Sequence, residues 1–492
     1  MPSTPTSSPR HLDPTSPDAP LPRRSPRPSP RPSPRTALGF EYAETIVHTA
    51  VSADNTPRDG PGDDNEYGLP SEFLAGSTGT SSFSFAEPGK MEAAEETRPE
   101  ITSIDLSGGN GSQVLMGDSD GRVCLYAPPA NHPKAVPVKQ RVPRIWHPAF
   151  TRGLDCLRSV EVEAKVHRAV LMPRRAPNVT SYMVANAQTV KLYRMREHLG
   201  RPKSKSVVPV CSFTGPHIYA PIHSLSLCSD EQTFLSADDF QVQWWHFEAG
   251  DGAKPFCLAD IHPRQGDANF EVSELLTAAS FHPTHGSLFL LSSSDGWTSI
   301  GDLRDPPSRR KRNYATTLAT RPEHNIVQHN HNDILCSVAD AAFLQANYVV
   351  TRDYLSLKVW DIRKPGAPTS VLPVHECLAG HLDELYDSDA IFDRFSISVD
   401  QQTGTVVSGL YDARVVVWQP ESGQEPLYIR GSTGEEGATA GAVGPLQWSE
   451  EPAFTAERVS NVGISGGGST VAFSSHDKLF VFDRVRSGSS RS

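Results

Sequence analysis

The sequence predicts an all-β protein, a seven-bladed β-propeller of the WD40 type preceded by a disordered N-terminal tail. The first observation is the segment TRDYLSLKVWDIRK, which runs from Thr351 to Lys364. After a polar turn, Leu355, Leu357 and Val359 alternate with polar residues, and the run ends in Trp-Asp. Such alternation predicts a strand with two unlike faces, and a Trp-Asp ending is typical of a propeller blade.

The second observation is that this pattern recurs. Six further segments combine a polar turn, a short alternating run and an aromatic or acidic end: DSDGRVCLY (118–126), ANAQTVKLY (185–193), SADDFQVQWW (236–245), SSDGWTSIGD (293–302), LYDARVVVW (410–418) and SSHDKLFVFD (474–483). Other apolar alternating runs precede several of them: ITSIDL from Ile101, IHSLSL from Ile222, AASFHP from Ala278 and FSISV from Phe395. The blade ends recur about every 52 to 67 residues, against about 40 to 45 for a minimal repeat, so each blade is expected to carry extra loop residues.

The chain divides into a tail and a propeller. Residues 1–80 are first rich in Pro, Ser and Arg and then acidic, a composition that predicts disorder. The propeller is expected over 81–486, followed by a disordered C-terminus at 487–492. The run SSFSFAE (81–87) is expected to supply the outermost strand of the last blade and so close the ring.

Five serines of the tail precede a proline, mostly beside an arginine: Ser8, Ser16, Ser25, Ser29 and Ser33. They are candidates for proline-directed phosphorylation, which would move the tail from basic toward acidic. A plain linker with chance Ser-Pro pairs is the alternative.

Composition excludes several classes of protein. The net charge of −11 disfavours non-specific binding to nucleic acid, which needs a concentrated basic face. No signal peptide opens the chain and no apolar run is long enough to cross a membrane, so we expect no membrane association. The seven cysteines are scattered without a CxxC pair, which favours reduced thiols. We expect a cytoplasmic protein, with the nucleus as a second compartment.

Motifs of catalysis are missing from the sequence. It contains no Walker loop, no HExxH and no GxGxxG after a strand. The segment HNIVQHNH carries His324, His329 and His331, but its loop-like surroundings favour ordinary surface histidines over metal ligands. We therefore expect no enzyme activity, no cofactor and no metal.

Acidic residues recur in the turns that lead into the alternating strands. Asp120, Asp239, Asp295 and Asp412 each lie six positions before a blade end. The simplest interpretation is that each caps its own turn by accepting backbone N–H groups. Asp353 is displaced by one position, and Asp238 adds a second acid beside Asp239. These two are therefore interpreted as better candidates for facing a partner.

Five segments share more than the generic repeat: LRSVEVEAKV (157–166), FLSADD (234–239), LLTAASFHP (275–283), TRDYLSLKVWDIRK (351–364) and VHECLAGHLDELYDSDAIFDRF (374–395). Together they resemble the WD40-type B regulatory subunit family of protein phosphatase 2A. Generic WD40 repeats lack the long segment 374–395, which makes the resemblance specific.

The resemblance implies a non-catalytic regulatory subunit of the phosphatase holoenzyme. Such a subunit docks on a HEAT-repeat scaffold that holds the catalytic subunit, and it recruits phosphoproteins with basic segments through an acidic groove on the propeller top. The residues that the resemblance assigns to the groove, with Asp238 added beside its neighbour, are Asp239, Asp238, Val272, Leu275, Asp353, Lys358, Ser159, Glu161 and Glu163. Lys203 and Lys205 are candidates for contact with the scaffold.

The chain also departs from the family pattern. Ala220 and Pro221 stand where the family has an aromatic-histidine pair, and Ser119 stands where a basic residue is expected. The segment 197–210 is shorter than the family's hairpin toward its scaffold. These departures leave a second hypothesis, a generic WD40 interaction scaffold that no longer binds the phosphatase, and a third, a propeller enzyme.

Overall fold

The computed structural model describes residues 40–47, 99–106, 113–128, 141–155, 160–173, 176, 178–197, 205–262, 272, 274–305, 316–431, 441–449 and 457–484 of the 492-residue chain. Residues 1–37 form a separate unit that lies outside the described residues. The fold described below belongs to the second unit, residues 38–492.

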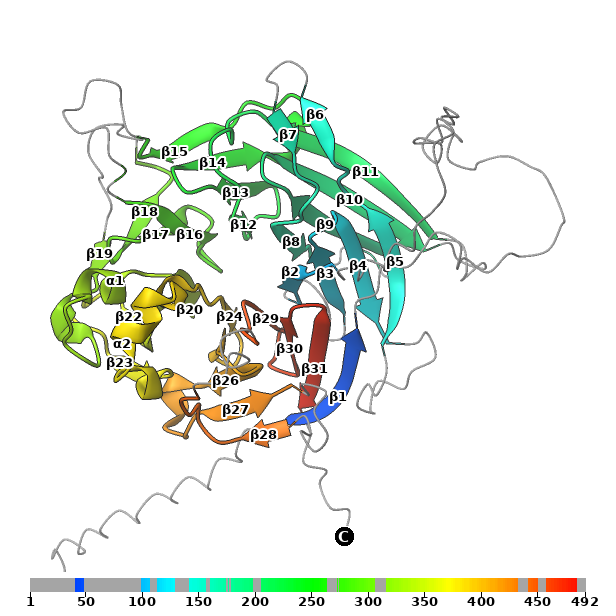
Figure 1. Ribbon diagram of the computed structural model, residues 1–492. Coiled ribbons are helices and arrows are strands. Elements are labelled where there is room, and N and C mark those ends of the chain that lie inside the picture. Colours follow the sequence, from blue (N-terminus) through cyan, green and yellow to red (C-terminus); the bar gives the residue numbers. More distant parts are fainter. Residues whose placement is uncertain are drawn as a thin grey trace, which may run out of the picture. The chain divides into compact units, whose positions relative to one another are not determined.

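The second unit is a ring of seven antiparallel β-sheets, the blades of a propeller (Figure 1). The first three blades comprise β2 (Ile101–Asp105), β3 (Val114–Asp118), β4 (Arg122–Ala127) and β5 (Val142–Pro148); β8 (Arg168–Leu171), β9 (Val179–Ala185), β10 (Thr189–Glu197) and β11 (Lys205–Thr214); and β12 (Ser224–Leu227), β13 (Thr233–Ala237), β14 (Gln241–His246) and β15 (Phe256–Asp260). The next two comprise β16 (Leu276–Phe281), β17 (Leu288–Ser293), β18 (Trp297–Asp302) and β19 (Thr316–Ala319); and β20 (Asp340–Leu344), β21 (Tyr348–Arg352), β22 (Ser356–Asp361) and β23 (Ser370–Pro373).

The sixth blade has a fifth strand, and the seventh joins the two ends of the described chain. They comprise β24 (Ile397–Asp400), β25 (Thr405–Gly409), β26 (Arg414–Trp418), β27 (Leu427–Arg430) and β28 (Gly441–Val443); and β29 (Asn461–Ile464), β30 (Thr470–Ser475), β31 (Lys478–Arg484) and β1 (Phe40–Val47). The first strand of each blade contacts the first strand of the next, and β29 returns to β2. The ring is therefore closed.

The seven-bladed prediction is confirmed, and the repeated segment has one structural meaning. Each of the seven alternating runs becomes the third strand of its blade: β4, β10, β14, β18, β22, β26 and β31. The apolar runs that precede four of them become the first strands β2, β12, β16 and β24. The pattern was readable because the two faces of each third strand pack against different neighbouring blades.

The strand that closes the ring is not the expected one. β1 pairs antiparallel with β31, from Phe40 opposite Arg484 to Val47 opposite Lys478. The expected donor, SSFSFAE (81–87), lies outside the described residues, and β1 holds the position assigned to it, so that expectation is wrong. β1 also lies upstream of the expected start of the propeller at residue 81. A bulge between Tyr42 and Glu44 interrupts the alternation of FEYAETIV, which hides the strand from a search for a period of two.

Short elements fill the connections between blades. They are the hairpin of β6 (Gly153–Asp155) and β7 (Val160–Val162), the helices α1 (Asn332–Cys336) and α2 (Leu382–Asp387), and the 3₁₀ turns η3 (Phe247–Ala249), η4 (Pro322–His324), η5 (Glu376–Leu378), η6 (Ala390–Phe392) and η7 (Pro420–Ser422). None of the helices in the described residues is long and apolar enough to cross a membrane.

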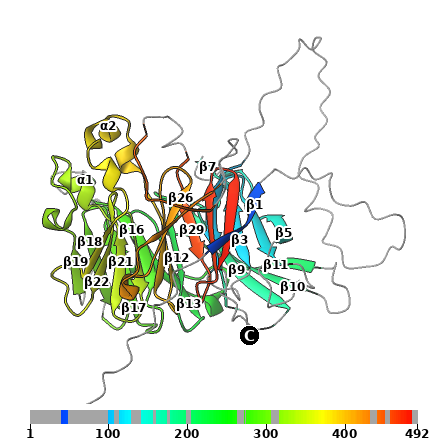
Figure 2. The same cartoon turned by 90° about the horizontal axis from the view of Figure 1, so that it is seen from below.

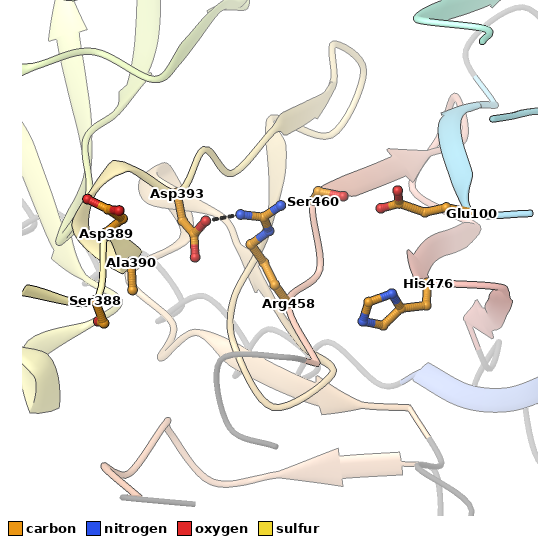
Figure 3. Close-up of a pocket in the computed structure, with 8 residues that line it drawn as sticks. All are labelled: Glu100, Ser388, Asp389, Ala390, Asp393, Arg458, Ser460 and His476. Atoms are coloured by element: carbon orange, nitrogen blue, oxygen red, sulfur yellow. Dashed lines mark hydrogen bonds and ion pairs between the residues drawn. The ribbon is translucent and has the colours of Figure 1, made fainter. Parts of the chain in front are cut away.

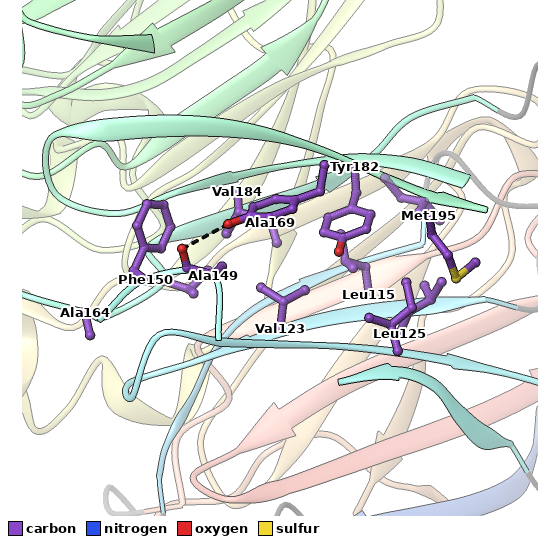
Figure 4. Packing of buried hydrophobic residues seen from close by; sticks show 14 residues of the cluster. Leu115, Val123, Leu125, Ala149, Phe150, Ala164, Ala169, Tyr182, Val184 and Met195 are labelled. Atoms are coloured by element: carbon purple, nitrogen blue, oxygen red, sulfur yellow. Dashed lines mark hydrogen bonds between the residues drawn. The ribbon is translucent and has the colours of Figure 1, made fainter. Parts of the chain in front are cut away.

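Apolar side chains between neighbouring blades form the core. Between the first two blades, Leu115 and Leu125 pack with Tyr182 and Met195, all of them buried (Figure 4). Comparable buried clusters lie between other neighbouring blades. Because each blade buries its faces against its neighbours, the ring gains apolar burial without one large central core.

Candidate functional site

One face of the ring carries the turns between the second and third strands of the blades. The links from each fourth strand to the next blade emerge at the same end, because the four strands alternate in direction. We call this the top face. Both α1 and α2 lie there (Figure 2).

Asp238 caps the turn between the second and third strands of the third blade. Its Oδ1 accepts the backbone N–H groups of Phe240 and Gln241, both at 2.8 Å. Its Oδ2 lies 2.8 Å from Nδ1 of His217, whose Nε2 lies 2.7 Å from the Ser236 hydroxyl. Burial raises the pKa of the Asp238 carboxyl, but the hydrogen bonds and charge of His217 and the two backbone donors outweigh it, and the pKa lies below its ordinary value.

Trp245 completes this chain of hydrogen bonds. Its indole Nε1 donates to the Ser236 hydroxyl at 2.8 Å, so the carboxylate, imidazole, hydroxyl and indole connect the turn to the third strand. All four residues are buried. Because buried polar groups are costly when they lack partners, a complete chain of this kind fixes the geometry of the blade.

Asp353 does the same work in the fifth blade. Its Oδ1 accepts the N–H groups of Leu355 and Ser356 at 2.9 and 2.7 Å. Its Oδ2 contacts Nζ of Lys358 at 2.6 Å, in a pair whose side chains are 5% and 0% exposed. Nζ of Lys358 also donates to Oδ1 of Asn325 at 3.1 Å. Both charged groups are therefore buried and paired with each other, and neither is exposed to a partner.

These contacts correct the interpretation of the turn acids. Asp238 and Asp353 occupy the same position of their blades, and each caps its turn, so the expectation that Asp353 leaves the turn and that both face a partner is wrong. Asp118 and Asn186 cap the equivalent turns of the first two blades. The next residue, Asp239, is the one whose carboxylate the turn does not use. Lys358, like Asp353, is buried rather than exposed to a partner.

Asp239 lies on the top face with its side chain 27% exposed. Its Oδ1 is 3.9 Å from Nε2 of His223, which is longer than a hydrogen bond. Burial raises the pKa of the Asp239 carboxyl, while the charge of Arg394 opposes the rise and that of Asp238 adds to it. Burial and the charge of Arg394 lower the pKa of His223 to about 4, so this imidazole is neutral near pH 7.

The other residues assigned to the groove are placed unevenly. Val272 is exposed, and Leu275 is half-buried directly before β16. Glu163 is exposed, with Oε2 4.0 Å from Nε2 of His167. Glu161 lies in β7, where only the backbone is described, and Ser159 lies outside the described residues.

The mouth of the central channel opens between the first strands of the blades. This pocket has a volume of about 510 Å³, and residues at or near the start of the first strand of every blade line it. Its charged lining consists of Lys165, Arg168, Arg394 and Arg458 with Glu100 and Asp340. Burial raises the pKa of the Asp340 carboxyl, whose oxygens accept the N–H groups of Ala341 and Ile397. The described lining of the mouth is therefore more basic than acidic, and Asp239 and Glu163 are not part of it.

A second pocket of about 370 Å³ adjoins the mouth and shares Glu100, Arg458 and Ser460 with it (Figure 3). Arg458 forms an ion pair with Asp393 across this pocket. The charges of the pair compensate each other, which leaves Glu100 and Asp389 as the other acidic residues of this lining.

The segment around α2 is the acidic and apolar part of the top face. Residues 374–393 contain no Lys or Arg. Its exposed acids are Glu376, Asp383, Glu384, Asp387 and Asp389. Tyr386 and Phe392 are exposed in the same segment, at 43% and 53%. This segment carries part of the family resemblance, but the resemblance assigns none of its residues to the groove. Its charge composition was the signal that could have predicted an acidic surface here.

The hairpin of β10 and β11 points to the opposite face. Its strands pair as far as Glu197 opposite Lys205, at the end of β10 that lies away from the top turns. The shortened segment therefore retains a hairpin. The side chain of Lys205 is not described, and Lys203 and the tail serines Ser8, Ser16, Ser25, Ser29 and Ser33 lie outside the described residues.

No family model matches. The chain is 29% identical over 362 residues to the gamma isoform of the 55 kDa regulatory B subunit of serine/threonine-protein phosphatase 2A from Mus musculus, an alignment that covers 64% of this chain and 76% of that protein. It is 28% identical over 357 residues to the serine/threonine-protein phosphatase 2A regulatory subunit sur-6 of Caenorhabditis elegans, covering 66% of this chain and 70% of that protein.

Among solved structures, the crystal structure of Raptor from Chaetomium thermophilum matches with a TM-score of 0.51 at 9% identity. The match covers 79% of this chain but only 28% of that one, and at this identity it supports the fold alone. In sequence, the chain is therefore similar to the 55 kDa regulatory B subunits of protein phosphatase 2A, at 28 to 29% identity over about two thirds of its length.

Proposed function

We propose that this chain is a non-catalytic regulatory subunit of a protein phosphatase 2A holoenzyme. In this proposal it binds the HEAT-repeat scaffold subunit and the catalytic subunit, and it holds phosphoproteins near the metal-dependent catalytic site of the other chain. Tethering a substrate in this way raises its effective concentration at the catalytic site. The observation that carries the proposal is the similarity to regulatory subunits over about two thirds of the chain.

The substrate surface that we propose differs from the groove expected from sequence. It combines Asp239, Val272 and Leu275 with the acidic, partly apolar α2 segment (376–392). Asp353 and Lys358 contribute only by fixing the blade beneath it. An exposed ion pair is worth only about 0 to 1 kcal/mol, so several carboxylates must act together with apolar contacts to select a basic segment.

The hairpin of β10 and β11 is the proposed contact with the scaffold. It projects at the face opposite the substrate surface, so one subunit would engage both partners without competition. We propose that this assembly works in the cytoplasm, and in the nucleus as a second compartment.

Affinity purification of the full-length chain from its own cells tests the proposal. We expect the scaffold and catalytic subunits to be recovered with the chain, and we expect recovery to fall when residues 198–204 are replaced by a two-residue turn. If other machinery is recovered and neither phosphatase subunit is present, the chain is a generic interaction scaffold and the proposal is wrong. If the phosphatase subunits are recovered but the hairpin variant behaves as the native chain does, only the docking assignment is wrong.

A further inference from the structure

We propose that His329, His331 and Asp383 form a binding site for a divalent transition-metal ion of the zinc class on the top face. The two histidines precede α1, and the aspartate lies in α2, 52 residues after His331. One ring nitrogen of each imidazole and a carboxylate oxygen of Asp383 lie within 4.8 Å of one another.

The distances from the two imidazoles to the carboxylate match those between ligands of one shared cation. Nε2 of His331 lies 3.3 Å and Nε2 of His329 lies 3.7 Å from the same oxygen, Oδ1 of Asp383. The His331 contact is a long hydrogen bond, whereas the His329 contact is longer than a hydrogen bond. Ligands about 2.0 to 2.1 Å from a tetrahedral zinc ion lie about 3.3 Å apart, close to both distances.

Packing holds the two segments in register. Leu335 of α1 lies in one buried cluster with Leu382 and Leu385 of α2. Figures 1 and 2 both show the two helices side by side. Asp383 directly follows one of these buried leucines, so its position relative to the histidine loop is set by the apolar contact.

The histidine rings are also oriented. The ring of His331 stacks on Tyr386, with centroids 4.4 Å apart and an interplanar angle of 11°. The backbone N–H of His329 donates to Oδ1 of Asn332 at 3.2 Å. The backbone N–H of His331 donates to Nδ1 of His329 at 3.4 Å, which leaves Nε2 as the ring nitrogen that faces Asp383; a metal bound there would displace the proton of Nε2.

The ligand set determines the class of ion and the state of the site. Two imidazoles and a carboxylate suit zinc and its neighbours in the first transition row, whereas magnesium and calcium prefer all-oxygen sites. The side chain of Asp383 is 80% exposed, so solvent would complete the coordination. A bound ion would join the link before the fifth blade to the link after it. His324, the third histidine of the loop, instead packs edge-on against Trp360.

Titration of the tag-free, chelator-treated full chain with Zn²⁺ by calorimetry, and with Co²⁺ by visible absorption, tests the site. We expect one strong equivalent with a dissociation constant in the micromolar range or below, Co²⁺ bands of low symmetry, and no heat from Mg²⁺. The variants His329→Asn, His331→Phe and Asp383→Asn should each weaken Zn²⁺ binding at least 10-fold, and phenylalanine at 331 retains the stack on Tyr386.

The matched control is His262→Asn. His262 is another top-face histidine beside a carboxylate, with Nδ1 2.8 Å from Oδ1 of Asp260, and its removal should leave the strong equivalent intact. The proposal is overturned if the native chain shows no saturable Zn²⁺ binding, or if the three ligand variants bind as tightly as the native chain. Circular dichroism of each variant separates loss of the site from loss of the fold.

Discussion

The buried pair of Asp353 and Lys358 offers the sharpest test of how the fifth blade is held together. We predict that Asp353→Ala strongly destabilises the ring, because it leaves the Lys358 ammonium buried with Asn325 as its remaining hydrogen-bond partner. At 2.6 Å and an effective dielectric constant near 20, the attraction between the charges is about 6 kcal/mol. Desolvation of both groups offsets much of this attraction, and breaking such a pair from one side costs about 3 to 5 kcal/mol.

The assay is urea unfolding followed by tryptophan fluorescence. Trp360 is buried in the same blade and donates to the Thr351 hydroxyl at 2.9 Å, so its emission reports on the perturbed region. With an unfolding entropy of about 2.1 cal/mol/K per residue over the ring, the same loss lowers the melting temperature by about 4 to 6 °C.

Two companion variants separate the causes. Asp239→Ala removes a half-exposed carboxylate from the same kind of turn, and it should change the free energy of unfolding by no more than about 0.5 kcal/mol. The double variant Asp353→Asn with Lys358→Met removes both charges and keeps an oxygen that can cap the turn, so it should recover at least half of the loss. Equal effects of Asp353→Ala and Asp239→Ala would refute the assignment of Asp353 to the interior.

Four further predictions follow from other parts of the chain. Burial lowers the pKa of His223 to about 4 and that of His375 well below its ordinary value, so below about pH 6.5 the unfolded chain binds protons that the native ring does not. The free energy of unfolding should therefore fall as the pH drops below about 6.5, by up to about 1.4 kcal/mol per pH unit for each histidine. Urea unfolding at pH 7.5, 6.5 and 5.5 measures this slope, and its absence would show that the two histidines are not buried in the neutral form. Deletion of residues 1–37 should leave the melting temperature unchanged. Deletion of residues 1–47 also removes β1 and exposes the edge of β31, so it should cause aggregation that light scattering can measure. If the two deletion variants aggregate to the same extent, β1 does not close the ring. Asp239→Lys should weaken binding of a basic phosphopeptide at least 5-fold in fluorescence anisotropy with little change in stability, and a large loss of stability would instead make Asp239 a structural residue. Treatment with a proline-directed kinase should alter the localisation or the substrate binding of the full chain, but not those of the variant that lacks residues 1–37. If kinase treatment affects the two chains equally, the prediction for the tail serines is wrong.

The ring was predictable because it rests on a local, repeated signal. Every third strand buries its two faces against different blades, so alternation must recur once per blade and survives in the sequence. β1 escaped because its alternation is broken by a bulge and because its partner, β31, lies more than 400 residues away. No local pattern specifies which upstream segment completes an edge.

The site was harder to predict because it depends on which of two adjacent residues is buried. In FLSADD, Asp238 and Asp239 are identical side chains, and sequence spacing assigned the turn to the second of them. The hydrogen bonds from His217 and from two backbone N–H groups assign it to the first. His217 lies 21 residues upstream, so the deciding partner is invisible to inspection of the turn alone.

The same distinction governs how residues are carried from one family member to another. Asp353 and Lys358 lie in one of the segments that carry the family resemblance, yet both are used inside the blade, where they stabilise the turn and the third strand. A residue that is retained because the blade needs it and a residue that is retained because a partner needs it look alike in a sequence. They differ in burial and in the number of internal hydrogen bonds, so Asp239 and the exposed acids of the α2 segment remain able to meet a partner, whereas Asp238 and Asp353 do not. The substrate surface that we propose for this chain therefore extends from the third blade toward α2 rather than across the basic mouth of the channel.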